Sequence, residues 1–202
     1  MHNWQEWRKK QRNQLITMRE VIVQETYQQW SWTITAALKK NFPNLQKMKI
    51  GLYWPFRNEY DPRPVTLYFK ELGATLALPA VINKHEPLRF CEWWSDAPMK
   101  EGPYGIPVPD GTPMVTVDAV IVPMVGFDQQ GYRLGYGSGY FDRTLATYQQ
   151  QPLTIGVAFE MQRLESVHPQ PHDIAMRYII TEAGVFQNAI NGLIPITQEK
   201  EK

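Results

Sequence analysis

Glycine alternates with larger side chains in the loop between Arg133 and Arg143, at positions 135, 137 and 139. Glycine reaches positive φ and lets the backbone approach a ligand closely. Successive backbone N–H groups, together with the positive end of the helix predicted to follow, can hold an anion. The two flanking arginines add fixed positive charges that suit phosphate. The loop therefore indicates a phosphate site, and a tight turn without a ligand is the alternative interpretation.

This loop does not match the two common phosphate-binding motifs. No Gly-Lys-Ser/Thr follows it, which excludes a Walker A loop, and its spacing is G-x-G-x-G rather than the G-x-G-x-x-G of dinucleotide-binding folds. Asp142 lies in the first turn of the predicted helix, where the helix dipole favours a carboxylate whatever its role. A metal-binding role for Asp142 therefore needs other support.

Two further segments carry groups that can bind charge. Arg8, Lys9, Lys10 and Arg12 cluster on a predicted helix, either as a solvated face or as a second set of cations that closes over a polyphosphate. His168 and His172 have an H-x3-H spacing, but Pro169 and Pro171 exclude the helix that would make it a zinc site, which we do not expect. Asp173 then either caps the segment that follows or brings a carboxylate toward the glycine loop.

The remaining chemistry is limited. Tyr53 to Phe56 end a predicted strand at the carboxyl edge of the sheet, where ligands of open α/β folds bind, and they either stack on a flat heterocycle or belong to the core. No Ser-His-Asp or Cys-His arrangement is evident, which disfavours a covalent nucleophile. Cys91 is the single cysteine, so the chain has no internal disulfide framework, and we interpret it as a small buried hydrophobe in a reducing compartment.

Strands and helices alternate along the chain, which favours an α/β sheet with helices on both faces. The stretch 94–114 contains five prolines and three glycines and is predicted to be a surface loop. Helices are predicted over 4–22, 25–40, 64–72 and 139–149. Strands are predicted over 48–53, 74–78, 88–92, 117–122, 154–159 and 178–180.

Length and composition bound the class of protein. The 202 residues predict one domain over 1–202, with 198–202 as a frayed charged tail. A net charge of +1 gives no bulk attraction to nucleic acid or to anionic membrane. The longest apolar run, 74–82, is far shorter than the ~20 residues that span a bilayer. Charged residues at 6–10 interrupt any apolar signal region, so we expect a cytoplasmic protein, acting as a monomer.

The segment VPMVGFDQQGYRLGYGSGYFDR at 122–143 closely resembles the signature of the 5-formyltetrahydrofolate cyclo-ligase family. Other parts of the family pattern are matched in order by RKKQR (8–12), IGLYWPFRNEYD (50–61), YGIPVP (104–109), IGVAFEMQ, HPQPHD and IITE. Gln11, Val108, Ser138 and Phe141 stand where Leu, Glu, Gly and Tyr are common in the family.

The resemblance implies a three-layer α/β/α sandwich with a mostly parallel sheet. It also implies that ATP and Mg²⁺ are used to convert 5-formyltetrahydrofolate, which can be polyglutamylated, into 5,10-methenyltetrahydrofolate, ADP and phosphate. Phosphorylation of the formyl oxygen would make it a good leaving group for attack by N10 of the same substrate. The alternatives are a ligase acting on another N-acyl substrate and a non-catalytic folate- or nucleotide-binding paralogue.

Site residues follow from the same resemblance. Catalytic roles are implied for Arg12, Arg133 and Arg143, and Mg²⁺ binding for Asp142 and Asp173. ATP binding is implied for Arg8, Lys9, Lys10, Gln11, Arg12, Arg133, Leu134, Gly135, Tyr136, Gly137, Ser138, Gly139, Tyr140 and Phe141. Binding of the folate substrate is implied for Phe56, Glu59, Asp61, Tyr104, Tyr136, Gly137, Ser138, Gly139 and Tyr140.

Overall fold

The structure, a computed structural model, describes residues 3–196. Its helices are α1 (Trp4–Glu20), α2 (Gln24–Asn41), α3 (Arg63–Glu71) and α4 (Tyr140–Ala146), with the 3-10 turns η1 (Pro43–Lys47), η2 (Pro103–Gly105) and η3 (Glu160–Gln162). Its strands are β1 (Lys49–Gly51), β2 (Thr75–Ala80), β3 (Arg89–Trp93), β4 (Met99–Glu101), β5 (Pro107–Pro109), β6 (Ala119–Pro123), β7 (Gly126–Asp128), β8 (Arg133–Leu134), β9 (Leu153–Val157), β10 (Arg163–Leu164), β11 (Tyr178–Thr181), β12 (Gly184–Ala189) and β13 (Gly192–Pro195).

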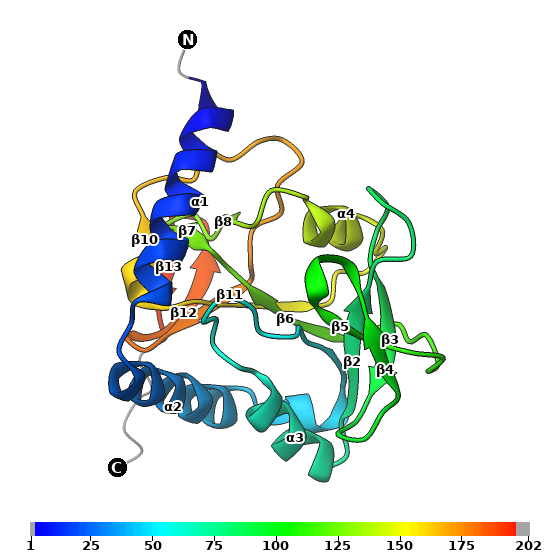
Figure 1. Cartoon of the computed structure of the whole chain (residues 1–202). Helices are drawn as coiled ribbons and strands as arrows, with labels where there is room; N and C mark the ends of the chain where they lie inside the picture. Colours follow the sequence, from blue (N-terminus) through cyan, green and yellow to red (C-terminus); the bar gives the residue numbers. More distant parts are fainter. Residues whose placement is uncertain (1–2, 197–202) are drawn as a thin grey trace, which may run out of the picture.

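Eight strands form the central sheet, in the order β13-β12-β11-β9-β6-β1-β2-β3 (Figure 1). The five strands from β11 to β2 are parallel, and antiparallel strands lie at both edges. In a parallel sheet all strands end on the same side, here called the carboxyl edge, so the loops that follow these strands gather there. The predicted α/β class and mostly parallel sheet are therefore confirmed.

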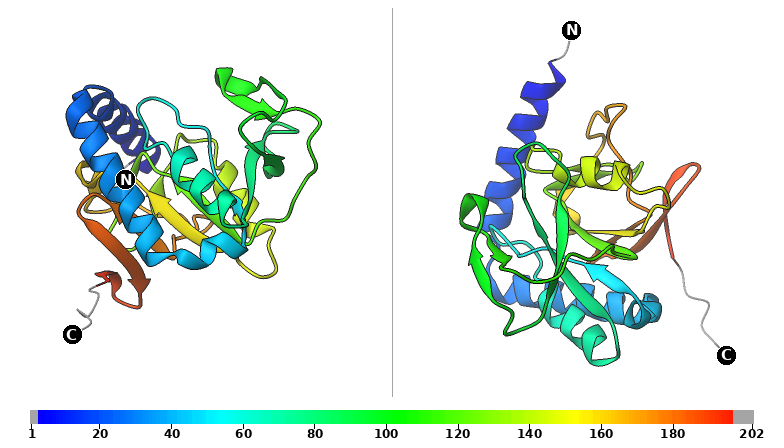
Figure 2. Two further views of the ribbon diagram at one scale, coloured as in Figure 1. Left: turned by 90° about the horizontal axis from the view of Figure 1, so that it is seen from below. Right: turned by 90° about the vertical axis from the view of Figure 1, so that its right-hand side faces the viewer.

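Strand β6 shows why the sheet is covered on both faces. Successive side chains of a strand point to opposite faces. Ala119 and Ile121 pack in the core between the sheet and helices α2 and α3. Val120 and Val122 pack in the core between the other face of the sheet and α4. In the right-hand view of Figure 2, α2 and α3 lie below the sheet and α4 above it. This explains why the predicted strand over 117–122 is an unbroken apolar run.

Helix α1 packs elsewhere, on the small three-stranded sheet β10-β7-β8. Leu15 and Ile16 of α1 are buried against Val125, Leu134 and Val167. The N-terminal half of α1 projects past the main sheet (Figure 1). The helix thus stands beside the carboxyl edge, where it presents a long face to the loops.

Every helix and strand predicted from the sequence is present, with shifted ends. The largest shift is in α4, which ends at Ala146 and not at 149. The Thr147 hydroxyl donates to the carbonyl of Thr144, and Gln151 Nε2 donates to the carbonyl of Leu145, so side chains satisfy the last carbonyls of α4. Such local hydrogen bonds offer the backbone an alternative to continuing the helix.

The prediction of a loop over 94–114 was wrong in part, because β4 and β5 form an antiparallel pair within it. Pro107 and Pro109 flank the paired Val108, and prolines are tolerated at such edge positions. No strand was predicted at β7, β8, β10, β12 or β13. The predicted tail at 198–202 lies outside the described residues. Among residues 3–196, no helix is both long and apolar enough to cross a membrane.

Candidate functional site

The glycine loop, residues 135–139, connects β8 to α4. Gly137 has φ +104° and Gly139, the residue before α4, has φ +63°, a region that favours glycine. A Cβ at Gly137 would lie 3.3 Å from Arg12 Cζ, and one at Gly139 would lie 3.1 Å from Arg143 Nη1. The loop backbone therefore lies against two guanidinium groups, one from α1 and one from α4.

These guanidiniums carry donors that the protein does not use. Arg143 Nη2 donates to the carbonyl of Ser138 at 2.6 Å. The Nε atoms of Arg12 and Arg143 are buried and have no hydrogen-bond partner among the described residues. Burial and the charge of Arg8 lower the pKa of Arg12. A buried, unpaired cationic donor is costly, and an anion bound at the loop would satisfy it, so the loop fits phosphate.

Arg133 and Asp142 join the two sides of the loop. Arg133 Nη2 forms an ion pair with Asp142 Oδ1 at 2.8 Å. Arg133 Nη1 donates to the carbonyl of Ile174, and the Ile174 N–H donates to Asp142 Oδ1. Desolvation lowers the pKa of Arg133 despite this carboxylate. The segment around 174 is thereby fixed beside the start of α4.

The environment of Arg8 matches neither interpretation of the basic cluster, a solvated face or a set of free cations that close over a polyphosphate. It is buried, forms an ion pair with Asp173, and donates to the carbonyls of Val167 and His168 at 2.9 and 3.1 Å. It is therefore neither a solvated side chain nor a free cation, although Lys9 and Lys10 are exposed as a solvated face would be. Asp173 accepts from the Gln170 N–H at 2.8 Å, so it caps the turn before it and not the segment after it.

The two aspartates implied for Mg²⁺ each accept hydrogen bonds on one oxygen. The other oxygen has no hydrogen bond in the described chain, although Oδ1 of Asp173 lies 3.8 Å from His172 Nε2. No group of three or more His, Cys, Asp or Glu side chains within residues 3–196 forms a metal cage. Mg²⁺ at phosphate sites commonly takes only one or two carboxylates and completes its shell with phosphate and water oxygens. The donor set thus fits Mg²⁺ bound together with a phosphate chain.

A second cluster lies at the other end of the glycine loop. Glu59 is 5% exposed and accepts hydrogen bonds from the Phe56 N–H and the Tyr136 hydroxyl, at 2.9 and 3.0 Å. Arg19 Nη2 lies 3.8 Å from Glu59 and donates to the Tyr136 hydroxyl at 2.6 Å. Burial raises the pKa of Glu59 to about 7, against the lowering effect of Arg19. This cluster joins α1, the segment after β1 and the glycine loop.

Sequence reasoning missed Arg19. A signal was present, because Arg8, Arg12 and Arg19 are spaced by four and seven residues and therefore share one face of α1. An arginine on the buried face of an amphipathic helix needs a partner, and Arg19 is 1% exposed. Its partners, however, are contributed by distant segments.

The residues implied for folate binding are only partly brought together. The rings of Phe56 and Tyr136 lie 6.0 Å apart, next to Glu59. Asp61 is instead paired with Arg63 at 2.7 Å, and Tyr104 is 71% exposed in η2. Among the described residues, no hydrogen bond, ion pair or ring contact joins Asp61 or Tyr104 to the glycine loop, so their folate roles stay predictions.

Other predicted residues take supporting positions. Leu134 is buried against α1, so only its backbone is open to a ligand. The guanidinium of Arg143 lies 5.0 Å from the Tyr140 ring, and Phe141 packs on the core beneath α4. Gln11 is half-buried and Gly135 has open space around it. Val108, the departure in the Pro-rich loop, is buried against Ala80 and Cys91, which confirms Cys91 as a buried hydrophobe.

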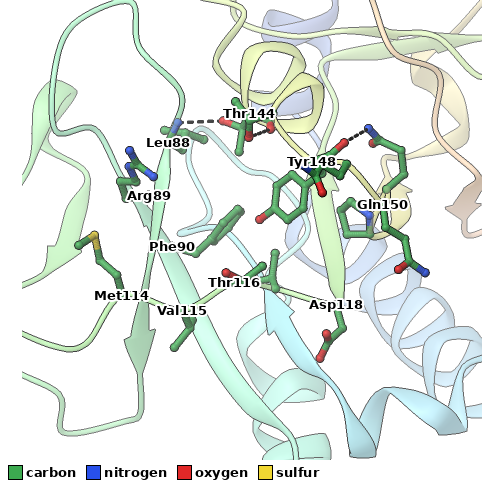
Figure 3. Close-up of a pocket in the computed structure, with 15 residues that line it drawn as sticks. Leu88, Arg89, Phe90, Met114, Val115, Thr116, Asp118, Thr144, Tyr148 and Gln150 are labelled. Carbon is green, nitrogen blue, oxygen red and sulfur yellow. Dashed lines mark hydrogen bonds between the residues drawn. The ribbon is translucent and has the colours of Figure 1, made fainter.

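A cleft of about 750 Å³ lies at the other end of α4, lined by residues that include Phe90, Thr116, Asp118 and Tyr148. Figure 3 shows the Tyr148 ring on the side of the cleft opposite Thr116, and Thr144 bonded to the Leu88 N–H. None of the residues predicted for the site lines it. The charged groups around the glycine loop therefore form a separate site.

Most of the chain is similar to known proteins. A sequence profile of the 5-formyltetrahydrofolate cyclo-ligase family matches residues 4–182. The chain belongs to this family. The 5-formyltetrahydrofolate cyclo-ligase of Haemophilus influenzae is 30% identical over 139 residues, which cover 65% of this chain and 74% of that protein. The cyclo-ligase of Escherichia coli K12 is 25% identical over 179 residues, which cover 84% of this chain and 97% of that protein.

Solved structures of cyclo-ligase relatives share the fold. The NMR structure of Aquifex aeolicus 5,10-methenyltetrahydrofolate synthetase superposes with a TM-score of 0.78 at 28% identity, covering 96% of this chain and 99% of that chain. The synthetase of Mycoplasma pneumoniae superposes with a TM-score of 0.72 at 23% identity, covering 87% of this chain and 98% of that chain. This similarity supports the fold alone. The cyclo-ligase fold thus extends over almost the whole described chain.

Proposed function

We propose that the protein closes the ring of 5-formyltetrahydrofolate to give 5,10-methenyltetrahydrofolate, with conversion of ATP to ADP and phosphate. The observation that carries the proposal is the glycine loop. Unpaired donors of Arg12 and Arg143 meet its positive-φ glycines, and Tyr136 of the same loop lies beside Phe56 and Glu59. One loop thus offers a cationic place for phosphate and, next to it, an aromatic and acidic place for a flat heterocycle.

The chain's residues have distinct roles in this proposal. The backbone of 135–139 and the guanidiniums of Arg12, Arg133 and Arg143 hold the triphosphate and stabilise the charge that develops during transfer. Asp142 and Asp173 would hold Mg²⁺, which would neutralise phosphate charge. Phe56 and Tyr136 stack on the pterin, and Glu59 hydrogen-bonds to it. We assign Lys9, Lys10 and Gln11 to the ATP side of the proposed site, and Asp61 and Tyr104 to its folate side, from the family resemblance.

The reaction needs alignment and no protein nucleophile. The formyl oxygen is amide-like and leaves poorly, so it first attacks the γ-phosphorus and ADP departs. The lone pair of N10 then forms a bond to the formyl carbon, the carbon–oxygen bond breaks and releases phosphate, and N10 loses its proton. Holding the three reacting groups together accounts for most of the rate. The absence of a nucleophilic triad from the sequence is consistent with this chemistry.

The test is a mixture of purified protein, MgATP and 5-formyltetrahydrofolate, followed by the absorbance of the methenyl product and by release of ADP. We expect both to appear together and to require all three components. Absence of an ATP-dependent product would overturn the proposal. ATP hydrolysis that 5-formyltetrahydrofolate does not stimulate would point to another N-acyl substrate, and ligand binding without turnover to a non-catalytic paralogue.

We further propose that residues 1–202 act as one monomeric catalytic domain in the cytoplasm. The family profile over 4–182 and the nearly full overlap with the Aquifex structure support a single unit. The single, buried cysteine is consistent with a reducing compartment. Light scattering of the purified protein tests the monomer.

A further inference from the structure

The proposed chemistry gives no role to Arg19, although this side chain is almost completely buried. It lies where α1 passes between the turn 56–59 and the glycine loop, and it contacts both. Arginine is almost never buried to this extent unless it is paired. A guanidinium carries five N–H donors in a fixed plane, so one arginine can hold several acceptors at set angles. The acceptors of Arg19 therefore indicate its role.

On one side, Arg19 holds the turn that carries the proposed folate residues. Its Nε donates to the carbonyl of Arg57 at 2.9 Å, and its Nη2 donates to the carbonyl of Phe56 at 3.4 Å. Asn58 Nδ2 donates in return to the backbone carbonyl of Arg19 at 2.8 Å. Nη2 also lies 3.8 Å from the Glu59 carboxylate. Each residue of the turn 56–59 thus contacts this one residue of α1.

The backbone of the turn needs such support. Arg57 and Asn58 have φ of 51° and 59°, so two successive residues that are not glycine adopt the left-handed conformation. This conformation costs free energy and persists only where the surrounding structure fixes it. The ion pair between Arg57 and Glu20 is exposed to solvent, so it contributes little. The buried Arg19, bonded to two carbonyls of the turn, is the stronger support.

On the other side, Arg19 holds the glycine loop. Its Nη2 donates to the Tyr136 hydroxyl at 2.6 Å, and that hydroxyl donates to Glu59 at 3.0 Å. Its Nη1 donates to the carbonyl of Met124, just after β6, at 3.4 Å. Tyr136 directly precedes Gly137, in the part of the loop proposed for phosphate. Arg19 thus joins the phosphate half of the site to the folate half.

We propose that Arg19 is a positioning residue through which the binding of one substrate strengthens the binding of the other. This inference rests on the proposed function, since it takes the phosphates to lie at the glycine loop and the pterin to lie at Phe56 and Glu59. Phosphate bound at 135–139 fixes the backbone around Tyr136. Through the Tyr136 hydroxyl and Arg19 it also fixes the turn 56–59, so a folate that binds second orders less of the protein. Folate that binds first strengthens ATP binding by the same factor.

The test measures this coupling between the two ligands. Calorimetry with Mg²⁺ gives the dissociation constant of 5-formyltetrahydrofolate with and without saturating β,γ-methylene-ATP, whose terminal phosphoryl group is not transferred. We expect the analogue to tighten folate binding by the parent protein about 5- to 150-fold, the typical range for coupled sites. Tyr136→Phe keeps the ring and removes the hydroxyl, and Arg19→Lys keeps the charge and removes the planar fork. Both variants should abolish the tightening.

Glu20→Gln is the matched control. Glu20 also joins α1 to the turn, through the Arg57 side chain, but it has no contact with Tyr136 among the described residues. The control should keep the ratio of the two dissociation constants that the parent has. A merely structural role of Arg19 would weaken folate binding equally with and without the analogue, so it would leave this ratio unchanged.

Each other outcome overturns the inference. A parent protein that binds the two ligands independently would leave the proposed function standing and remove the coupling. An unchanged ratio in either Tyr136→Phe or Arg19→Lys would make Arg19 a structural residue only, and a lost ratio in Glu20→Gln would assign the coupling to α1 as a whole. A parent protein that binds neither ligand, alone or together, would overturn the proposed function as well. Should Arg19→Lys fail to fold, Tyr136→Phe, which leaves Arg19 in place, decides.

Discussion

The hydroxyl of Tyr136 donates a hydrogen bond of 3.0 Å to Glu59, a residue 77 positions away in the sequence. The same oxygen accepts one of 2.6 Å from Arg19. The glycine loop is therefore fixed to the segment after β1 through a buried carboxylate. Because that carboxylate has a pKa of about 7, its charge changes within the range in which an enzyme of this kind is assayed.

Glu59 should make both stability and turnover depend on pH. Its folded-state pKa of about 7 is above the ordinary 4.5, because burial disfavours the charge. The folded protein thus holds the extra proton, and this stabilisation is complete below pH 4.5 and is lost as the pH rises through 7. Urea unfolding should show a larger fall in the free energy of unfolding between pH 5 and 8 for the parent than for Glu59→Gln.

Arg19 supplies the control for this pH dependence. Arg19 lowers the pKa of Glu59, while the nearest other titratable groups are the phenols of Tyr53 and Tyr136, which stay neutral. Arg19→Met should therefore move the inflection in kcat/KM against pH upward, and Glu59→Gln should remove it. An inflection at the same pH in all three proteins would assign it to another group.

Gly137→Val should abolish ATP binding and turnover, with little loss of fold. A β-branched residue resists the φ of +104°, and its side chain would meet the Arg12 guanidinium in the place proposed for phosphate. Gly111→Val is the matched control, because Gly111 also has positive φ, +69°, but has nothing within 4 Å of its Cβ position. Calorimetry with ATP and thermal unfolding separate the two. Equal ATP affinity in both variants would make the loop a simple turn.

Arg12→Ala should weaken ATP binding about 10- to 150-fold, the range for hydrogen bonds to a charged group. Its thermal midpoint should stay close to that of the parent, because Arg12 Nε has no partner in the described chain. Arg12→Lys should also bind ATP more weakly, since a point charge cannot make a two-pronged contact with phosphate. Gln5→Ala, exposed on the same helix, is the control. Small, equal effects in all three variants would favour a solvated face.

Asp142→Asn and Asp173→Asn should each raise the Mg²⁺ concentration that gives half the maximal rate, because a hard cation prefers an anionic oxygen. Both should also lower the thermal midpoint. Each leaves a buried arginine, Arg133 or Arg8, without its counter-charge, and breaking a buried pair costs about 3–5 kcal/mol.

The Mg²⁺ dependence is therefore measured at a temperature where all variants remain folded. Asp110→Asn is the control, since the Asp110–Lys100 pair is on the surface and such pairs contribute little. An unchanged Mg²⁺ requirement together with a lowered midpoint would make either aspartate structural only.

The parallel core could be predicted from the sequence because a strand buried on both faces is an unbroken apolar run, as in β6. The strands that were missed are short or belong to the antiparallel end of the sheet, where half-exposed residues such as those of β12 give no strong periodicity. The glycine loop was also predictable, since its spacing is local. The partners of Arg8 and Arg19 could not be predicted. Asp173 approaches Arg8, and Tyr136 approaches Arg19, only in the folded sheet, which brings their distant segments together.

The ion pair between Arg8 and Asp173 joins residues 165 positions apart. Bringing such distant residues together costs chain entropy that only the completed sheet can offset. Helix α1 buries few of its own side chains, among them Leu15 and Ile16, and an isolated helix of this length is marginal in water. We therefore expect α1 to dock after the sheet has formed, so a refolding chain should regain its sheet before it regains the affinity for a nucleotide that we propose.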